Sequence, residues 1–191
     1  MKINGSFFSS SLLFFFLLLC FVQNYSTSFS YQLLHFSRIA YEDRHIIESW
    51  TCVKHCSLVE AIQPEVFEDA GNLGYISYSP AMDAIVVTFR GSDYDEPLDD
   101  WITDLSFFRT DFPSCNGCKV HTGFYNASQR LRGLVRSKIE SFRLVYPESK
   151  LIMTGHSLGG ALATMQALDS QEFGNNIDLV YIFGNPRVGN R

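Results

Sequence analysis

Apolar and polar residues follow regular spacings along the chain after residue 30, and these spacings predict an alternation of helices and strands. Apolar residues recur at helical spacing in three segments, and short runs rich in β-branched and aromatic residues mark four more. The predicted helices are residues 31–42, 122–146 and 158–173. The predicted strands are residues 72–79, 84–89, 151–154 and 179–183, of which the last three are nearly continuous apolar runs typical of buried strands.

The order of these segments predicts an α/β domain. Strand 151–154, helix 158–173 and strand 179–183 form a βαβ unit, whose two strands run parallel with a right-handed crossover. Residues 80–83 (PAMD) have turn chemistry, so strands 72–79 and 84–89 are expected to form a hairpin. No internal repeat or linker interrupts the chain after residue 30, which indicates one domain.

The first 28 residues have the pattern of an export signal. Lys2 is followed by an uncharged stretch, and residues 12–22 are all apolar. Eleven apolar residues are too few to span a bilayer, which takes about 20 in a helix. We therefore expect a signal peptide over residues 1–28, cleaved after Ser28, a domain over residues 29–191 and a secreted protein. An uncleaved anchor is the alternative, because Phe7 and Phe8 lengthen the apolar zone.

Composition and charge exclude two classes of protein. The chain of 191 residues has 15 basic and 20 acidic residues, a net charge of −5, whereas a nucleic-acid-binding surface needs a cationic excess. A hydrophobic content of 46% is too high for a disordered chain.

Four cysteines remain after the predicted signal is removed, namely Cys52, Cys56, Cys115 and Cys118. An even number in an exported chain predicts two disulfides. Three connectivities are possible, and the short spacings favour Cys52–Cys56 and Cys115–Cys118. A four-thiolate zinc site is the alternative, because C-x3-C followed by C-x2-C resembles one.

Residues 155–159 (GHSLG) form a G-x-S-x-G motif with a strand directly before it and a helix directly after it. Such a tight turn holds the Ser157 hydroxyl at the carboxyl edge of the sheet, where it can act as a nucleophile. Gly155 and Gly159 allow the strand and helix backbones to approach closely. The amide of Leu158 points to where an oxyanion would form. A simple strand-to-helix turn with a capping serine is the alternative.

Taken together, five motifs resemble those of the class 3 lipases, the fungal lipase-like group of α/β-hydrolases, and occur in that family's order. They are residues 88–92 (TFRGS), 100–105 (DWITDL), 120–124 (VHTGF), 155–160 (GHSLGG) and 183–190 (FGNPRVGN). The resemblance covers about residues 31–191. It implies an α/β-hydrolase fold, a mostly parallel sheet flanked by helices. It also implies hydrolysis of acylglycerols or related esters, with no metal and no organic cofactor. Ser157 would be the nucleophile, and Ser92 and Leu158 would be the oxyanion donors.

A lid is predicted directly after Ser92. Leu98, Trp101, Ile102 and Leu105 lie on one face of a short amphipathic helix. Such a helix would cover the site in water and turn over at a lipid–water interface. A fixed helix packed on the core is the alternative.

The chain departs from the family after Ser157. A serine nucleophile needs a histidine base and an acid to orient it, and in α/β-hydrolases both follow the serine. None of the 34 residues after Ser157 is a histidine. The His156 side chain should point away from the site, and His121 is only a weak candidate for a substitute base. Asp178 lies at the start of a strand, at the edge of the sheet opposite to the site. The resemblance also implies C-terminal strands that this chain lacks, so we expect either the N-terminal part of a longer lipase or a truncated homologue.

Two other functions stay open at this stage. A truncated homologue would act as a lipid-binding module, and feruloyl-type esterases share the architecture. Apolar residues in and near the predicted lid favour a lipid substrate. Asn126 begins the glycosylation sequon N-A-S and lies about 200° around its helix from Phe124, so it is expected to face solvent. Nothing in the sequence bears on the oligomeric state.

Overall fold

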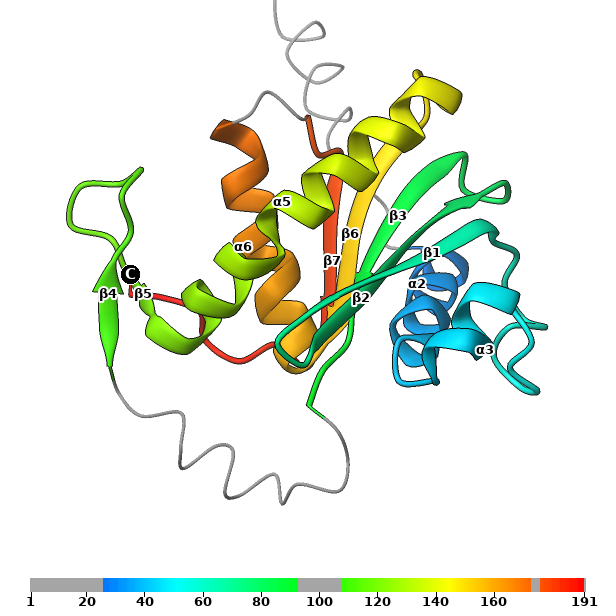
Figure 1. The fold of residues 1–191 in the computed structure, drawn as a ribbon, viewed down its shortest axis with the longest axis horizontal. Helices are drawn as coiled ribbons and strands as arrows, with labels where there is room; N and C mark the ends of the chain where they lie inside the picture. Colours follow the sequence, from blue (N-terminus) through cyan, green and yellow to red (C-terminus); the bar gives the residue numbers. More distant parts are fainter. Residues whose placement is uncertain (1–25, 93–107, 173–175, 191) are drawn as a thin grey trace, which may run out of the picture.

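A mixed sheet of five strands is the centre of the fold (Figure 1). The structure, a computed structural model, describes residues 26–92, 108–172 and 176–190. The strands stand in the order β1-β2-β3-β6-β7, with β1 to β3 antiparallel and β3, β6 and β7 parallel. Their bounds are β1 (Ile62–Asp69), β2 (Asn72–Ser79), β3 (Ala84–Phe89), β6 (Lys150–His156) and β7 (Leu179–Phe183).

Helices cover both faces of the sheet. Helix α2 (Thr27–Ile39) packs on one face, and α5 (Thr122–Val145) and α6 (Leu158–Glu172) lie side by side on the other (Figure 1). Side chains along the strands point alternately to the two faces of the sheet and so fill an apolar core on each face. Val86 and Ile152 point to the α2 side. Their neighbours Val87 and Met153 point to the α5 and α6 side. A short helix, α3 (Arg44–Ser49), contacts β1.

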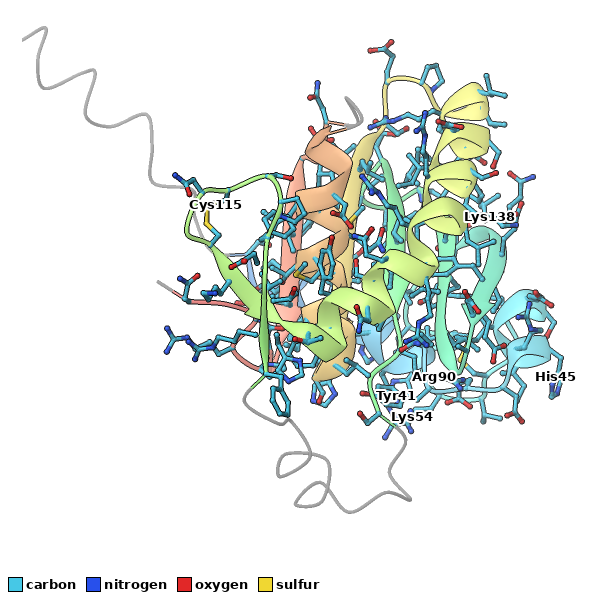
Figure 2. The ribbon with its side chains drawn as sticks, turned by 60° about the vertical axis from the view of Figure 1, so that its left-hand side comes forward. Tyr41, His45, Lys54, Arg90, Cys115 and Lys138 are labelled. Carbon is cyan, nitrogen blue, oxygen red and sulfur yellow. A yellow bond between two sulfur atoms is a disulfide. The ribbon has the colours of Figure 1, made fainter. Side chains whose placement is uncertain are left out.

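A hairpin of two short strands, β4 (Arg109–Asp111) and β5 (Lys119–His121), stands apart from the main sheet. Residues 188–190 lie against β5 through a bridge between Val120 and Gly189. Figure 2 shows Cys115 on the loop of this hairpin. The hairpin and residues 188–190 therefore form one unit beside the start of α5.

The cysteines are joined locally, as Cys52–Cys56 and Cys115–Cys118. These are the pairs that the short spacings favour. Sulfurs that are bonded to each other are not thiolate ligands, so the structure gives no support to the zinc alternative. Cys52 and Cys56 are both buried, whereas the second disulfide lies in the exposed loop between β4 and β5.

Most of the predicted elements are present. Strands β2 and β3 have the predicted bounds and form the predicted hairpin, and β6, α6 and β7 form the βαβ unit with parallel strands. The prediction for β7 as a buried strand is wrong, because its residues are partly exposed. Among the described strands β7 stands at the sheet edge, where one side has no strand beside it.

The predicted helix 31–42 starts earlier than expected. Helix α2 begins at Thr27, and the Ser26 hydroxyl caps it by accepting the Phe29 amide at 3.2 Å. The predicted signal cleavage after Ser28 would remove this cap, and residues 1–25 of that signal lie outside the described residues. No helix in the described part of the chain has both the length and the apolar character needed to cross a membrane.

Candidate active site

The turn between β6 and α6 holds Ser157 in a strained conformation. Its φ is +56°, in the left-handed region that residues with a side chain seldom adopt. The Ser157 amide donates to the Phe183 carbonyl at 2.9 Å, and the Ser157 carbonyl accepts the Gly160 amide at 2.9 Å. Backbone contacts on both sides therefore fix this turn, and the Ser157 side chain is half-exposed at the carboxyl end of β6.

The two glycines of the motif are required by close backbone contacts. A Cβ atom at Gly155 would lie 2.4 Å from the Gly159 carbonyl carbon. A Cβ atom at Gly159 would lie 2.1 Å from the Phe89 carbonyl oxygen. Both distances are far inside contact range, and backbone atoms have little room to move away. The prediction that these glycines let strand and helix backbones meet is confirmed.

The two predicted oxyanion donors lie at the carboxyl ends of neighbouring strands. Leu158 is the first residue of α6, so its N–H has no acceptor within the helix. Ser92 follows β3, whose last residue, Phe89, pairs with Gly155 in the parallel ladder. The Ser92 hydroxyl oxygen is buried and has no hydrogen-bond partner within the described residues. A buried hydroxyl without a partner is costly in a resting protein and suited to a group that arrives with a ligand.

A tyrosine that sequence reasoning did not single out connects the two halves of this edge. The Tyr41 hydroxyl lies 2.9 Å from His156 Nδ1, a contact between residues 115 positions apart. A Cβ at Gly91, next to Ser92, would be 2.1 Å from the same hydroxyl oxygen. Tyr41 thus contacts both the residue before Ser157 and the residue before Ser92. His156 is hydrogen-bonded to Tyr41 and not to Ser157, in line with the expectation that it points away.

Arg90 of the TFRGS segment holds the backbone before and after Tyr41. Its Nε donates to the Ala40 carbonyl at 2.5 Å, and an Nη donates to the Glu42 carbonyl. These two carbonyls flank Tyr41 in the sequence and lie at the C-terminal end of α2. A guanidinium there also interacts favourably with the negative end of the helix. The strand that leads to Ser92 is therefore tied to α2 by one side chain.

His121 and Asp178, considered above as partners of Ser157, have other roles, and so does Asp169 on α6. His121 caps α5, its Nδ1 accepting the Phe124 amide at 3.3 Å. Asp178 accepts the Leu151 amide at 2.8 Å, at the amino end of β6 and thus opposite Ser157. Asp169 accepts from the Gln129 side chain on α5. None of these observed contacts supplies a base or an orienting acid to Ser157.

A pocket of about 250 Å³ lies between the β4–β5 hairpin, the start of α5 and the segment that follows β7. It is lined by Arg109, His121, Phe124 and residues 186–189. Two of the sequence motifs, VHTGF and FGNPRVGN, therefore meet in one cavity. The four predicted lid residues, Leu98, Trp101, Ile102 and Leu105, lie outside the described residues. Asn126 is exposed on α5, as expected from the helix geometry.

Comparison with known proteins gives consistent matches. The model of the family "Lipase (class 3)" matches residues 86–191. The secreted mono- and diacylglycerol lipase 1 of Fusarium solani is 37% identical over 116 residues, which are 61% of this chain and 34% of that protein. The crystal structure of a lipase from Rhizopus microsporus var. chinensis superposes with a TM-score of 0.74 and 30% identity, covering 87% of this chain and 61% of that one.

A third match is a fungal lipase–inhibitor complex, described as a model for interfacial activation. It has a TM-score of 0.69 and 28% identity, and the match covers 87% of this chain and 65% of that one. The chain thus spans about a third of the curated relative and under two thirds of either solved structure. All of these proteins are lipases, and the predicted α/β-hydrolase fold is confirmed by the solved structures. The chain belongs to the class 3 lipase family.

Proposed function

We propose that the whole protein is a secreted carboxylic ester hydrolase that acts on acylglycerols with Ser157 as its nucleophile. The observation that carries this proposal is the conformation of Ser157, which has φ at +56° on a turn that close backbone contacts hold on both sides. Strain of this kind persists where the surrounding structure enforces it, and it is typical of functional sites. The names of the relatives, which include a secreted mono- and diacylglycerol lipase, support the substrate class and secretion.

The chemistry follows from the positions of the groups. The Ser157 hydroxyl attacks the ester carbonyl carbon, loses its proton to a base, and leaves negative charge on the former carbonyl oxygen. The amides of Leu158 and Ser92 are proposed to bind this oxygen. The Ser92 hydroxyl, which has no partner among the described residues, supports a third hydrogen bond to it. The alcohol leaves with a proton, and water then hydrolyses the acyl-enzyme. One such donor is worth a factor of about 10² to 10³ in rate.

The base and its orienting acid are proposed for the whole protein and not for a residue of this chain. No histidine follows Ser157 in the sequence, and the histidines that precede it are engaged elsewhere or lie on α3. The proposed lid, with Leu98, Trp101, Ile102 and Leu105 on its apolar face, would cover the site until it meets a lipid–water interface. The interfacial activation described for a related fungal lipase supports this role.

Covalent labelling of Ser157 tests the proposal. The product of the entire coding sequence is treated with a fluorophosphonate, which reacts with an activated serine, and is assayed on emulsified mono-, di- and triacylglycerols. We expect labelling and hydrolysis, with a jump in rate at the solubility limit of the substrate. In Ser157→Ala both should be lost, hydrolysis by roughly 10⁴-fold or more. Hydrolysis that survives this substitution would exclude Ser157 as the nucleophile.

A second candidate is a lipid-binding module without catalysis, because none of the observed hydrogen bonds of His35, His121 and His156 reaches Ser157. The same experiment separates the two functions. A protein that binds lipid vesicles but is never labelled would support the module. A protein that is labelled but prefers feruloyl esters to acylglycerols would instead be a feruloyl-type esterase.

A further inference from the structure

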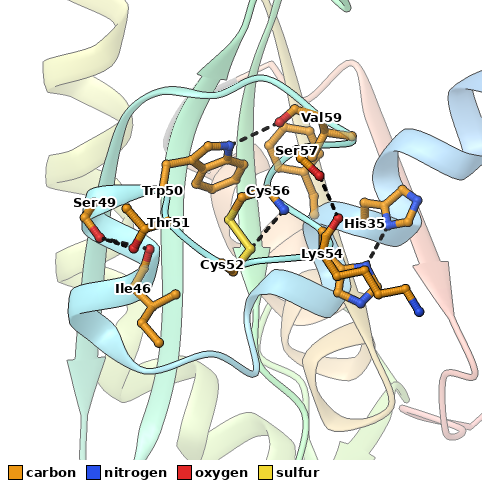
Figure 3. The surroundings of a disulfide bond; sticks show 12 residues. His35, Ile46, Ser49, Trp50, Thr51, Cys52, Lys54, Cys56, Ser57 and Val59 are labelled. Atoms are coloured by element: carbon orange, nitrogen blue, oxygen red, sulfur yellow. Dashed lines mark hydrogen bonds between the residues drawn. A yellow bond between two sulfur atoms is a disulfide. The ribbon is translucent and has the colours of Figure 1, made fainter.

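Three side-chain contacts hold the loop of residues 52–59, and one of them joins it to α2; Figure 3 shows the three together. The disulfide between Cys52 and Cys56 closes the loop on itself. The Trp50 indole N–H donates to the Val59 carbonyl at 3.1 Å, which fixes the far end of the loop. The third contact joins the loop to α2 through two histidines.

The two imidazole rings meet through the same ring nitrogen. His35 Nδ1, on α2, lies 2.9 Å from His55 Nδ1, in the loop. His35 is only 6% exposed, and the Tyr31 ring packs edge-on against it at 4.3 Å between centroids. His55 is half-buried. A distance of 2.9 Å between two ring nitrogens requires that one of them carries a proton and the other a lone pair.

The surroundings of the two rings indicate which nitrogen carries the proton. His35 Nε2 is buried and has no hydrogen-bond partner within the described residues. A buried N–H without an acceptor is more costly than a buried lone pair, so the favoured arrangement has the His35 Nδ1–H donating to His55 Nδ1. In that arrangement the pair has two places for another proton. One is the buried His35 Nε2, and the other is the His55 lone pair that already accepts the hydrogen bond.

The charges around the pair also oppose protonation. Burial is the main cause that lowers the pKa of His35, and the neighbouring His55 and Lys54 lower it further. The pKa of His55 is lowered by burial, then by Arg38 and Lys54, while Glu42 acts in the opposite direction. Both rings therefore favour the neutral form at neutral pH, in which the hydrogen bond between them can exist.

We propose that the contact between His35 and His55 is a pH-sensitive staple that holds the 52–59 loop on α2 at neutral pH and opens in mildly acidic solution. Two protonated rings cannot share this hydrogen bond, and two cations at this distance repel each other. The neutral histidine pair stabilises the loop fully at pH values above about 6.5, the pKa of histidine in an unfolded chain. That stabilisation is lost as the pH falls below 6.5 toward the lower pKa of the folded pair.

Hydrogen exchange of the full chain at pH 7.5 and pH 5.5 tests the staple, with exchange times corrected for the intrinsic pH dependence of exchange. The protection of peptides that cover residues 52–59 should fall about tenfold, since each extra proton bound on opening shifts the equilibrium by up to tenfold per pH unit. Peptides of β6 should keep their protection, which shows that the opening is local. Loss of protection in both regions, or in neither, would overturn the proposal.

Two variants separate the pair from other acid effects. His55→Asn places an amide oxygen near the position of Nδ1, where it can still accept from His35, and it removes one titrating ring. This variant should keep the loop protected at both pH values. His45→Asn, at an exposed histidine on α3 (Figure 2), should retain the wild-type pH dependence. If His55→Asn shows the same tenfold loss as the wild type, the staple does not exist.

A measurement on the wild-type protein covers the case in which His55→Asn does not fold. Proton NMR follows the ring signals of His35 and His55 from pH 8 to pH 4.5. Both rings should titrate below 6.5, and the amide signals of residues 52–59 should shift over the same interval. Titration at or above 6.5, or loop amides that do not respond, would contradict the proposal.

Discussion

The turn at Ser157 and the 52–59 loop are both tight local structures, but different forces hold them. At the turn, backbone meets backbone, and Gly155 and Gly159 leave no space for a side chain. In the loop, side chains make the contacts: a disulfide, an indole N–H and a pair of histidines. The turn should therefore be intolerant of added atoms. The loop should tolerate substitution better and respond to acid and to reducing agents.

The largest change in the free energy of unfolding is expected from adding one methyl group at the Ser157 turn. In Gly159→Ala the new Cβ would lie 2.1 Å from the Phe89 carbonyl oxygen, which belongs to a central strand. We expect the free energy of unfolding to fall by about 3 kcal/mol, the upper part of the range for overpacking, measured by urea denaturation. Gly133→Ala is the matched control. Its Cβ would meet nothing within 4 Å on α5, so it should stabilise the protein by up to about 1 kcal/mol.

A Gly159→Ala variant as stable as the wild type would show that the β3 backbone can yield, and the contrast with the loop would fail. If Gly133→Ala also destabilised strongly, the cost would be a general feature of alanine in these helices. The difference between the two variants in the free energy of unfolding therefore measures the cost of the steric clash at Gly159.

The same contrast explains what the sequence could predict. Strands β2 and β3, the βαβ unit and the turn at Ser157 each lie in a continuous segment, so spacing and glycine positions are enough to identify them. Strand β1 is not among the predicted strands, because Pro64 interrupts its sequence pattern. It also has a positive φ at Gln63, which the sequence does not reveal. An edge strand tolerates both features. Helix α3 and the β4–β5 hairpin are too short to produce a periodic signal.

Contacts between distant residues account for what the sequence did not reveal about the site. Tyr41 and His156 are 115 positions apart, and His35 and His55 are 20 apart, and no local pattern announces either pair. Ser92 was identified only through the resemblance of its segment to a known family. A buried hydroxyl without a partner is visible only in three dimensions.

A smaller loss of stability is expected at Arg90, outside the two regions compared above. Arg90 links the strand before Ser92 to the C-terminal end of α2 by donating to the Ala40 and Glu42 carbonyls. In Arg90→Met both hydrogen bonds are lost, and the free energy of unfolding should fall by about 2 kcal/mol. A hydrogen bond to a charged group contributes about 1.5–3 kcal/mol, and water recovers part of the loss of the two because Arg90 is only half-buried. Urea denaturation measures it. Labelling of Ser157 in the whole protein should slow as well.

Arg44 provides the control, because its guanidinium also has two partners but lies at the surface. It contacts Glu48 at 3.3 Å and Glu68 at 3.1 Å with 47% of its side chain exposed. Exposed ion pairs contribute about 0–1 kcal/mol, so Arg44→Met should cost less than half as much as Arg90→Met. Equal losses in the two variants would mean that the link between α2 and the Ser92 strand is no stronger than a surface contact.

The smallest effect on stability is expected at Asn126, which belongs to neither region. Its exposure on α5 is compatible with a glycan, and we predict that the protein secreted from a eukaryotic host loses mass on enzymatic deglycosylation. Asn126→Gln should abolish that loss and change the free energy of unfolding by less than about 0.5 kcal/mol, as usual for surface substitutions. A wild-type protein whose mass does not change on deglycosylation would show that the sequon is not used.

Ser128→Ala sharpens the same experiment, because it removes the sequon by changing a buried residue instead of an exposed one. Ser128 is fully buried, and both its hydroxyl and its carbonyl accept hydrogen bonds from the Gln166 amide of α6. Both variants should lack the glycan, but Ser128→Ala should also lower the free energy of unfolding by about 1 kcal/mol through the lost hydroxyl contact. If the two variants are equally stable, the contact between α5 and α6 rests on apolar packing and on the carbonyl at Ser128. A loss of stability that is common to both variants would mean that the glycan itself contributes to folding.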